Sequence, residues 1–186
     1  MSYQSVIEQL RTSTDRQVME AYRRYGLGLI TEAQFVQLAA AVIAEANNSA
    51  VTVADVALSA ELTRLSGIAH APLGILPFSG DQRRLEKGVR TLLDEVAVTG
   101  DITERLTRFA RTEPLTAANN AYSTAVTGSP SVEGWVRQMD GDPCQLCQWW
   151  WRGGRVWPKS HRMAHHKGCS CTQRVVTVDR VKAVAR

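Results

Sequence analysis

Two cysteine pairs near the end of this 186-residue chain are the groups best placed to do chemistry. Cys144 and Cys147 form a C-x₂-C pair, and Cys169 and Cys171 follow as C-x-C. Two close pairs on either side of a loop are a common arrangement for tetrahedral zinc, because a C-x₂-C turn can aim two thiolates at one ion. His166, three residues before Cys169, could replace one of the thiolates. The spacing therefore predicts a zinc site with four ligands drawn from these five side chains.

A zinc ion with four protein ligands is typical of a structural site, because no position is left for a substrate. Catalytic alternatives lack parts of their motifs. A zinc deaminase needs H-x-E or C-x-E upstream of P-C-x-x-C, and c-type haem attachment needs a histidine where Gln148 stands. His165 and His166 are similar to the histidines of HNH nucleases, but neither Asn nor His follows them. We therefore expect no enzyme activity. The main alternative to zinc is that the thiols are free or paired in disulfides, in a virion or secreted setting.

Four of the five tryptophans lie between the two cysteine pairs. Clustered tryptophans form small cores or anchor protein interfaces more often than they stack on bases. Three in a row cannot all face inward on a strand, so at least one is expected to face a partner. The predicted contact residues are Trp149, Trp150, Trp151, Arg152, Arg155 and Trp157.

Charge is unevenly distributed along the chain. Residues 1–151 hold 13 Lys and Arg against 17 Asp and Glu, whereas residues 152–186 hold 9 against the single Asp179. A basic tail on an acidic body favours an anionic partner such as nucleic acid or an acidic protein face, although a solvated basic face has the same composition. No apolar run is long enough for a membrane, and the polar N-terminus is unlike a secretory signal. These features predict folding in a cytosol, with reduced thiols and no membrane partner.

Apolar residues recur at helical spacing through most of residues 2–128, which predicts a helical body. Helices are expected over 2–26, 31–67, 81–100 and 101–128, with a Gly- and Pro-containing linker at 67–80. The helix expected over 31–67 contains the run Asn-Asn-Ser at 47–49, where helix formation is weakest. Two shorter helices in line are therefore an alternative to one long helix. Pro114 must kink or restart the fourth. Capping boxes are expected at Thr31 with Gln34 and at Asp101 with Glu104.

After Pro130 the sequence changes character. Short β-branched or aromatic runs at 133–139, 154–157 and 173–178 predict small strands. The expected fold class is α+β, a mostly α-helical N-terminal body followed by a small zinc-stabilised β-rich C-terminal module. We expect a helical hairpin or bundle over 1–79 and a second domain over 80–186, with helices at 81–127, the Cys/His module at 131–178 and the basic tail. Zinc would supply folding free energy that a β unit of about forty residues could hardly find in its own core.

A set of motifs occurs in a characteristic order from residue 108 onward. An R-T-E helix with small and Asn residues is followed by a strand with Trp, a C-x₂-C pair, a Gly-containing turn and H-x-x-C-x-C. These motifs fall on Arg111, Thr112 and Glu113; Asn119 or Asn120; Trp135; Cys144 and Cys147; and His166, Cys169 and Cys171. The ordered set resembles the Mu F-type family of phage minor head proteins. Members often have Pro after that histidine and Arg between the last cysteines, where this chain has Lys167 and Ser170.

The resemblance implies a virion protein of the capsid interior or portal vertex, folded in the host cytoplasm, that acts in head assembly or in DNA packaging or ejection. Its partners would be the portal protein, the major capsid protein or both, with packaged DNA meeting the basic C-terminal segment. Trp135 would be structural, and Arg111 and Glu113 would brace their helix against the zinc unit or, failing that, form an exposed charged pair of little energetic value. Two rival hypotheses are a zinc-dependent HNH-like nuclease and a zinc-module DNA-binding protein.

Overall fold

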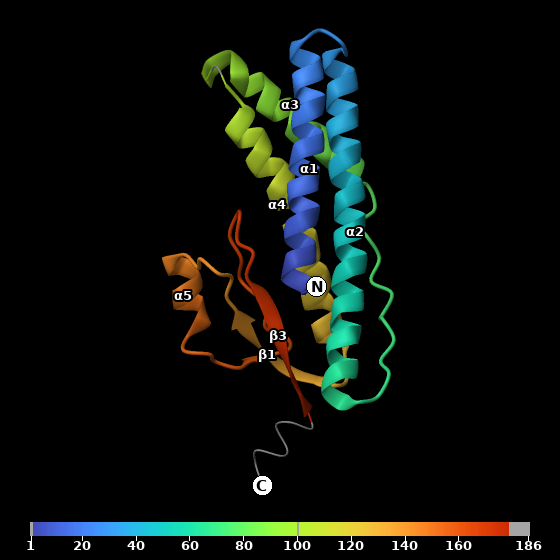
Figure 1. Ribbon diagram of the computed structural model, residues 1–186, viewed down its shortest axis with the longest axis vertical. Coiled ribbons are helices and arrows are strands. Elements are labelled where there is room, and N and C mark those ends of the chain that lie inside the picture. Colours follow the sequence, from blue (N-terminus) through green and yellow to red (C-terminus); the bar gives the residue numbers. More distant parts are fainter. Residues whose placement is uncertain (1, 100, 179–186) are drawn as a thin grey trace.

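The computed structural model describes residues 2–99 and 101–178. Within these ranges it contains five helices and a three-stranded antiparallel sheet near the C-terminal end, so the predicted α+β class is confirmed. Figure 1 shows a long helical body beside a smaller module that holds the sheet. No helix in the described ranges is both long enough and apolar enough to cross a membrane. The predicted basic tail beyond residue 178 lies outside the described residues.

The body is built on a pair of long antiparallel helices. α1 (Tyr3–Gly26) and α2 (Glu32–Ser66) form a hairpin, and α4 (Thr103–Gly128) packs against both (Figure 1). Small side chains let the helices approach closely, and Ala39 and Ala50 of α2 are fully buried at these contacts.

α2 is one unbroken helix, which decides between the two expected arrangements. It begins with the predicted capping box: the Gln34 N–H donates to Thr31 Oγ1 at 3.2 Å, and the Thr31 N–H donates to Gln34 Oε1 at 2.8 Å. At the weak point, the buried Asn47 side chain donates to Asp81 Oδ2 at 2.6 Å, at the start of α3 (Asp81–Thr99). The polar residue thus finds its partner on another helix, and α2 continues past it.

α4 differs from the prediction at its start, and of the two alternatives at Pro114 it excludes the restart. The expected capping box is wrong: the N-cap is Ile102, and Asp101 accepts a hydrogen bond from the Thr103 N–H, at 2.8 Å. Ile102 is fully buried, so core packing rather than a side-chain cap fixes the first turn. The helix does not restart at Pro114, although the missing N–H removes a helical hydrogen bond there.

The linker at 67–80 is irregular, as predicted, and a buried carboxylate holds its middle. Asp55 of α2 accepts the backbone N–H groups of Leu73 at 2.9 Å, Gly74 at 2.7 Å and Ile75 at 3.0 Å. Hydrogen bonds to an ionised carboxylate are stronger than neutral ones, so Asp55 fixes the linker along α2.

The sheet has the strand order β2-β1-β3, with both pairings antiparallel. β1 (Val132–Gln138) is central, between β2 (Trp157–Pro158) and β3 (Thr172–Thr177). β1 and β3 confirm two of the predicted strands within one residue, whereas the strand predicted over 154–157 overlaps β2 only at Trp157. Gly134 is required where β1 meets β2, because a Cβ there would lie 2.3 Å from the Trp157 carbonyl oxygen.

A short helix lies where the sequence predicts a loop. α5 (Gln145–Trp151) carries Trp149 to Trp151, so these tryptophans lie on a helix rather than on a strand. The helix ends at Arg152, whose φ of 52° is left-handed, and Gly153 and Gly154 also have positive φ. This run turns the chain towards β2.

The sheet and the helices share a hydrophobic core. One cluster joins Leu58 of α2, Tyr122 of α4, Trp135 of β1 and Val175 of β3. A second cluster joins α1, α2, α3 and α4 at the other end of the body. Both clusters draw residues from either side of the predicted boundary between residues 79 and 80, and the first anchors the module to the body.

Candidate metal centre

The first cysteine pair lies at the start of α5. Cys144 is the N-cap and Cys147 lies in the first turn, where the Gln148 N–H donates to the Cys144 carbonyl at 3.1 Å. Because residues three apart on a helix lie on the same side, this turn can direct both sulfurs towards one region. Cys144 is exposed and Cys147 is buried, so the pair extends from the surface into the module.

The second pair lies in the turn before β3. The Cys169 N–H donates to the His166 carbonyl at 3.1 Å, and Gly168 has a φ of 84°, a conformation that favours glycine. Cys169 and Cys171 are both buried. His166 Nδ1 lies 3.0 Å from the Lys167 carbonyl oxygen, and a hydrogen bond there leaves Nε2 as the ligating nitrogen.

The two cysteine pairs and His166 meet in one cluster. His166 Nε2 lies 3.1 Å from Cys144 Sγ and 3.3 Å from Cys147 Sγ, and Cys147 Sγ lies 3.3 Å from Cys169 Sγ. Two overlapping groups could hold a metal ion: Cys144, Cys147 and His166, and Cys147, Cys169 and Cys171. All five predicted ligands are therefore brought together, with Cys147 common to both groups.

The chemistry of this cluster suits a thiophilic ion. Thiolate and imidazole ligands select ions such as zinc, copper(I) or iron, whereas calcium and magnesium require oxygen ligands. All four cysteines are free thiols, and the Cys147–Cys169 sulfur separation of 3.3 Å is well beyond the roughly 2.05 Å of a disulfide bond. The cluster could therefore hold a metal ion, with five available side chains for the four positions of a tetrahedral site.

The four thiols differ in pKa when no ion is bound. A hydrogen bond from the Cys147 backbone N–H lowers the pKa of Cys144, and a hydrogen bond with the Cys171 side chain lowers the pKa of Cys169. Burial raises the pKa of Cys147 to about 12, and the hydrogen bond with Cys169 together with burial raises the pKa of Cys171. An ion that binds these sulfurs as thiolates must therefore displace protons from them.

Arg137 is a buried cation beside the cluster that the sequence analysis missed. It lies on β1, with Nη1 4.0 Å from Cys147 Sγ and Nη2 donating to the Ala164 carbonyl. Its guanidinium also lies 5.2 Å from the centre of the Trp150 ring. Strand alternation is the signal that could have identified it, since Arg137 follows the buried Trp135 by two positions on the same face. A cation in this place favours a neighbouring thiolate.

The six predicted contact residues divide into two groups. Trp150 and Trp157 are half-buried: the Trp150 ring centre lies 6.1 Å from that of His166, and the Trp157 ring contacts both His161 and the Arg155 guanidinium. These two tryptophans belong to the packing of the module. The exposed group consists of Trp149, Trp151, Arg152 and Arg155, and 62% of the Trp149 surface is open to solvent.

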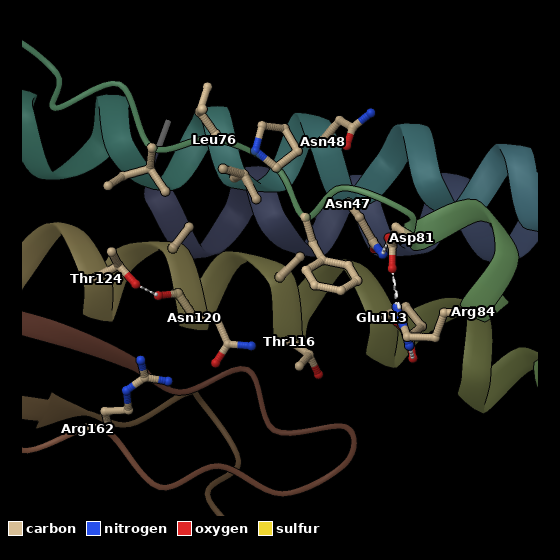
Figure 2. Close-up of a pocket in the computed structure, with 16 residues that line it drawn as sticks. Asn47, Asn48, Leu76, Asp81, Arg84, Glu113, Thr116, Asn120, Thr124 and Arg162 are labelled. Atoms are coloured by element: carbon tan, nitrogen blue, oxygen red, sulfur yellow. Dashed lines mark hydrogen bonds and ion pairs between the residues drawn. The ribbon is translucent and has the colours of Figure 1, made fainter.

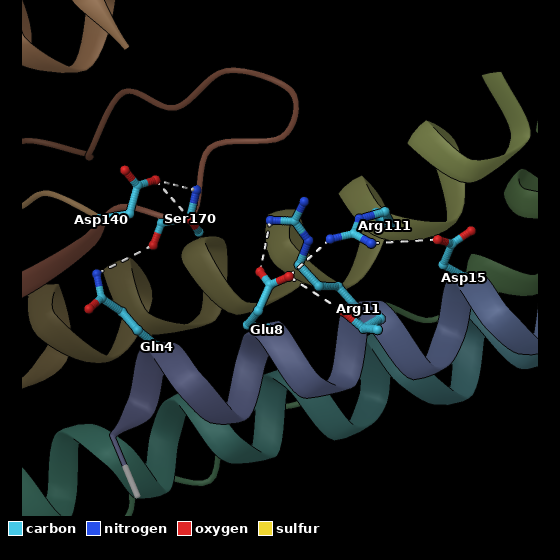
Figure 3. Close-up of polar contacts among 8 residues, drawn as sticks. Gln4, Glu8, Arg11, Asp15, Arg111, Asp140 and Ser170 are labelled. Atoms are coloured by element: carbon cyan, nitrogen blue, oxygen red, sulfur yellow. Dashed lines mark hydrogen bonds and ion pairs between the residues drawn. The ribbon is translucent and has the colours of Figure 1, made fainter. Parts of the chain in front are cut away.

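Arg111 and Glu113 do not brace α4 against the Cys/His module, and this prediction is wrong for the described contacts. Arg111 reaches α1, with Nη2 2.9 Å from Glu8 Oε1 and Nη1 3.6 Å from Asp15 Oδ2 (Figure 3). Glu113 pairs with Arg84 of α3. The reason is their place on α4: the sheet packs on the later part of this helix, around Tyr122. Trp135 is buried, and its Nε1–H donates to the His161 carbonyl at 2.8 Å.

A cavity of about 570 Å³ lies apart from the Cys/His cluster, between α2, α4 and the linker (Figure 2). Asp81, Arg84 and Glu113 line one end, and Arg162 of the module lines the other. The described residues that line it include neither cysteine nor histidine. This cavity is therefore not part of the candidate metal site.

Comparisons with protein-family models, with curated proteins and with solved structures found no match to this chain. Proposals about its function therefore depend on its own residues and geometry, and on the ordered motifs of its C-terminal part.

Proposed function

We propose that the Cys/His cluster binds one structural zinc ion, and that the protein is a non-catalytic minor head protein of the Mu F-like type in a phage virion. The observation that carries the proposal is the convergence of the C-x₂-C and H-x-x-C-x-C segments into one cluster. Zinc prefers four tetrahedral ligands of this kind, and such a site leaves no position for a substrate. When bound, zinc would supply folding free energy to a small module.

The five candidate side chains can be assigned in part to the four ligand positions of the proposed zinc site, which would clamp the two segments together. Cys147 belongs to both possible groups, so we assign it to the ligand set, with three further ligands from Cys144, His166, Cys169 and Cys171. Cys144 and Cys147 lie at the start of α5, and the other three lie in the turn before β3. Holding these two segments together would fix the orientation of α5 on the module.

We propose that the exposed group on α5 and the following turn contacts the portal protein, the major capsid protein or both. Trp and Arg are the residues that most often dominate the energetics of protein interfaces. Trp149, Trp151, Arg152 and Arg155 supply both kinds on one short segment. The excess of basic residues after residue 151 supports a further contact with packaged DNA.

Metal analysis tests the zinc site. Protein purified under reducing conditions should carry about one zinc per chain, as expected for a single tetrahedral site. Cys147→Ser should release the ion and loosen the module, because it removes the residue common to both groups. Gln145→Ser, an exposed change in the same helix, is the matched control and should retain zinc. Absence of zinc from the reduced wild type, or equal zinc in both variants, would contradict the site.

Location in the virion tests the assembly role. Mass spectrometry of purified particles of the encoding phage should detect the chain, and density for it should lie at the portal vertex or capsid interior. Absence from intact particles would overturn the role. Metal-dependent cleavage of plasmid DNA that is lost in His165→Ala would instead indicate an HNH-like nuclease. Sequence-specific DNA binding that persists at raised salt would indicate a DNA-binding protein.

A further inference from the structure

We infer that Asp140 is a positioning residue for the metal site, which acts by holding the turn between Cys169 and Cys171 in the conformation that presents their sulfurs. The inference rests on the proposed metal binding and extends it to a residue that none of the ligand motifs includes. Asp140 follows β1 and lies four residues before Cys144, so the sequence places it nearer to the other cysteine pair.

Asp140 contacts the turn through its side-chain carboxylate. Its Oδ2 accepts the Ser170 backbone N–H at 3.3 Å and the Ser170 Oγ–H at 2.8 Å (Figure 3). One carboxylate oxygen therefore accepts both donors of Ser170, the residue between the two cysteines.

These contacts matter because a C-x-C turn has a single residue between its two sulfurs. Rotation of the Ser170 backbone would move Cys169 and Cys171 together, so the donors of Ser170 are an effective place to fix both. Hydrogen bonds to an ionised carboxylate are about twice as strong as neutral ones. Partners of this kind around metal sites typically change metal affinity by about 10- to 100-fold when they are removed.

Asp140 acts through the turn and does not itself complete the ligand set. Neither of the two groups that could hold an ion includes it. Its Oδ2 is already occupied by the two Ser170 donors, and its Oδ1 is buried without a hydrogen-bond partner in the described part of the chain. The carboxylate is thus oriented by Ser170 rather than by the sulfur cluster.

The opposite side of the turn is held by α1. Gln4 Nε2 donates to the Ser170 carbonyl at 3.5 Å, and Gln4 Oε1 accepts from Gln138 Nε2 at 3.3 Å. Further along α1, burial lowers the pKa of Arg11, and the negative charges of Glu8 and Asp140 oppose that shift. Figure 3 shows this face of α1, where Arg11 and Arg111 both meet Glu8. The turn is therefore fixed between Asp140 and the helical body.

A pair of matched variants tests the inference. Asp140→Ala and Asp142→Ala each remove one carboxylate close to Cys144, so they change the charge near the site equally. Asp142 is exposed and makes no hydrogen bond or ion pair in the described structure, so Asp142→Ala isolates the effect of charge. Zinc affinity would be measured on the full chain by competition with a chromogenic chelator under reducing conditions.

Relative to the wild type, Asp140→Ala should weaken zinc binding by about 10- to 100-fold, whereas Asp142→Ala should change it by less than about threefold. Asp140→Asn, which keeps an acceptor oxygen without the charge, should lie between the wild type and Asp140→Ala. Hydrogen exchange of the Ser170 amide in the zinc-loaded protein should become faster in Asp140→Ala alone. This readout reports the turn directly and separates positioning from a general loss of stability.

Equal zinc affinity in Asp140→Ala and Asp142→Ala would overturn the inference while leaving the zinc site in place. A wild type without zinc affinity would instead overturn the proposed function, so the two failures are distinguishable. If Asp140→Ala does not fold, Ser170→Ala against the exposed control Ser160→Ala decides the question. Ser170→Ala removes one of the two donors to Asp140 and should weaken zinc binding several-fold, and an unchanged affinity would overturn the inference.

Discussion

Cys147 lies where the two arms of the clamp meet, with His166 Nε2 on one side and Cys169 Sγ on the other. Cysteine type and spacing were enough to identify it and the four other possible ligands before any fold was known. Asp140 and Asp142 could not be separated in the same way. Both are acidic residues just before the first pair, and only the fold brings Ser170 to one of them. Residues that act through a partner distant in sequence leave no linear pattern.

The thiol pKa values predict that metal binding weakens as pH falls. Burial raises the pKa of Cys147 to about 12, so this thiol holds its proton at pH 7 and the ion must displace it. Protons compete more strongly at lower pH, so zinc affinity should fall by at least about tenfold from pH 8 to pH 7, one factor of ten for each proton displaced. Chelator competition at the two pH values measures this change. A pH-independent affinity would show that Cys147 does not ligate as a thiolate.

Among the elements, those with long periodic patterns were predictable and those fixed by tertiary contacts were not. α2 repeats its apolar face over 35 residues and carries a capping box, and both its start and its end match the expectation. α5 has seven residues and a single buried position, Cys147, so no helical period is visible in its sequence. The start of α4 was misplaced because burial of Ile102, which local capping rules do not consider, determines it.

The linker between α2 and α3 should depend on Asp55. Asp55→Ala would leave the Leu73, Gly74 and Ile75 N–H groups without their acceptor, so the free energy of unfolding should fall by about 3 kcal/mol. Chemical denaturation measures that change, and faster amide hydrogen exchange at these three residues would locate it. Asp94→Ala on the exposed face of α3 is the control and should have little effect. Unaltered exchange in Asp55→Ala would show that other contacts hold the linker.

For the whole molecule, the shared hydrophobic core determines whether the C-terminal module can unfold separately from the helical body. Leu58 of α2 and Tyr122 of α4 lie in one cluster with Trp135 and Val175 of the sheet. The sheet therefore completes its hydrophobic core with helices that lie before it in the chain, in addition to the small buried cluster of Cys147, Cys169 and Cys171 within the module. This sharing could not be predicted from the sequence, because periodicity shows which face of an element is apolar but not which element covers it. The module should consequently unfold together with the body.

The tryptophans allow this coupling to be measured. All five lie between residues 135 and 157, so tryptophan fluorescence reports the module, whereas circular dichroism reports mainly the long helices. With zinc bound, both signals should show the same denaturation midpoint, the mark of a single cooperative unit.

A chelator should lower the midpoint of the fluorescence transition more than that of the circular dichroism transition, because it removes zinc from the module but leaves the contacts between the helices. Cys147→Ser should give the chelated result without chelator. Separate midpoints with zinc bound would show that the module unfolds independently, and a fluorescence midpoint unaffected by chelation would show that the ion does not hold it together.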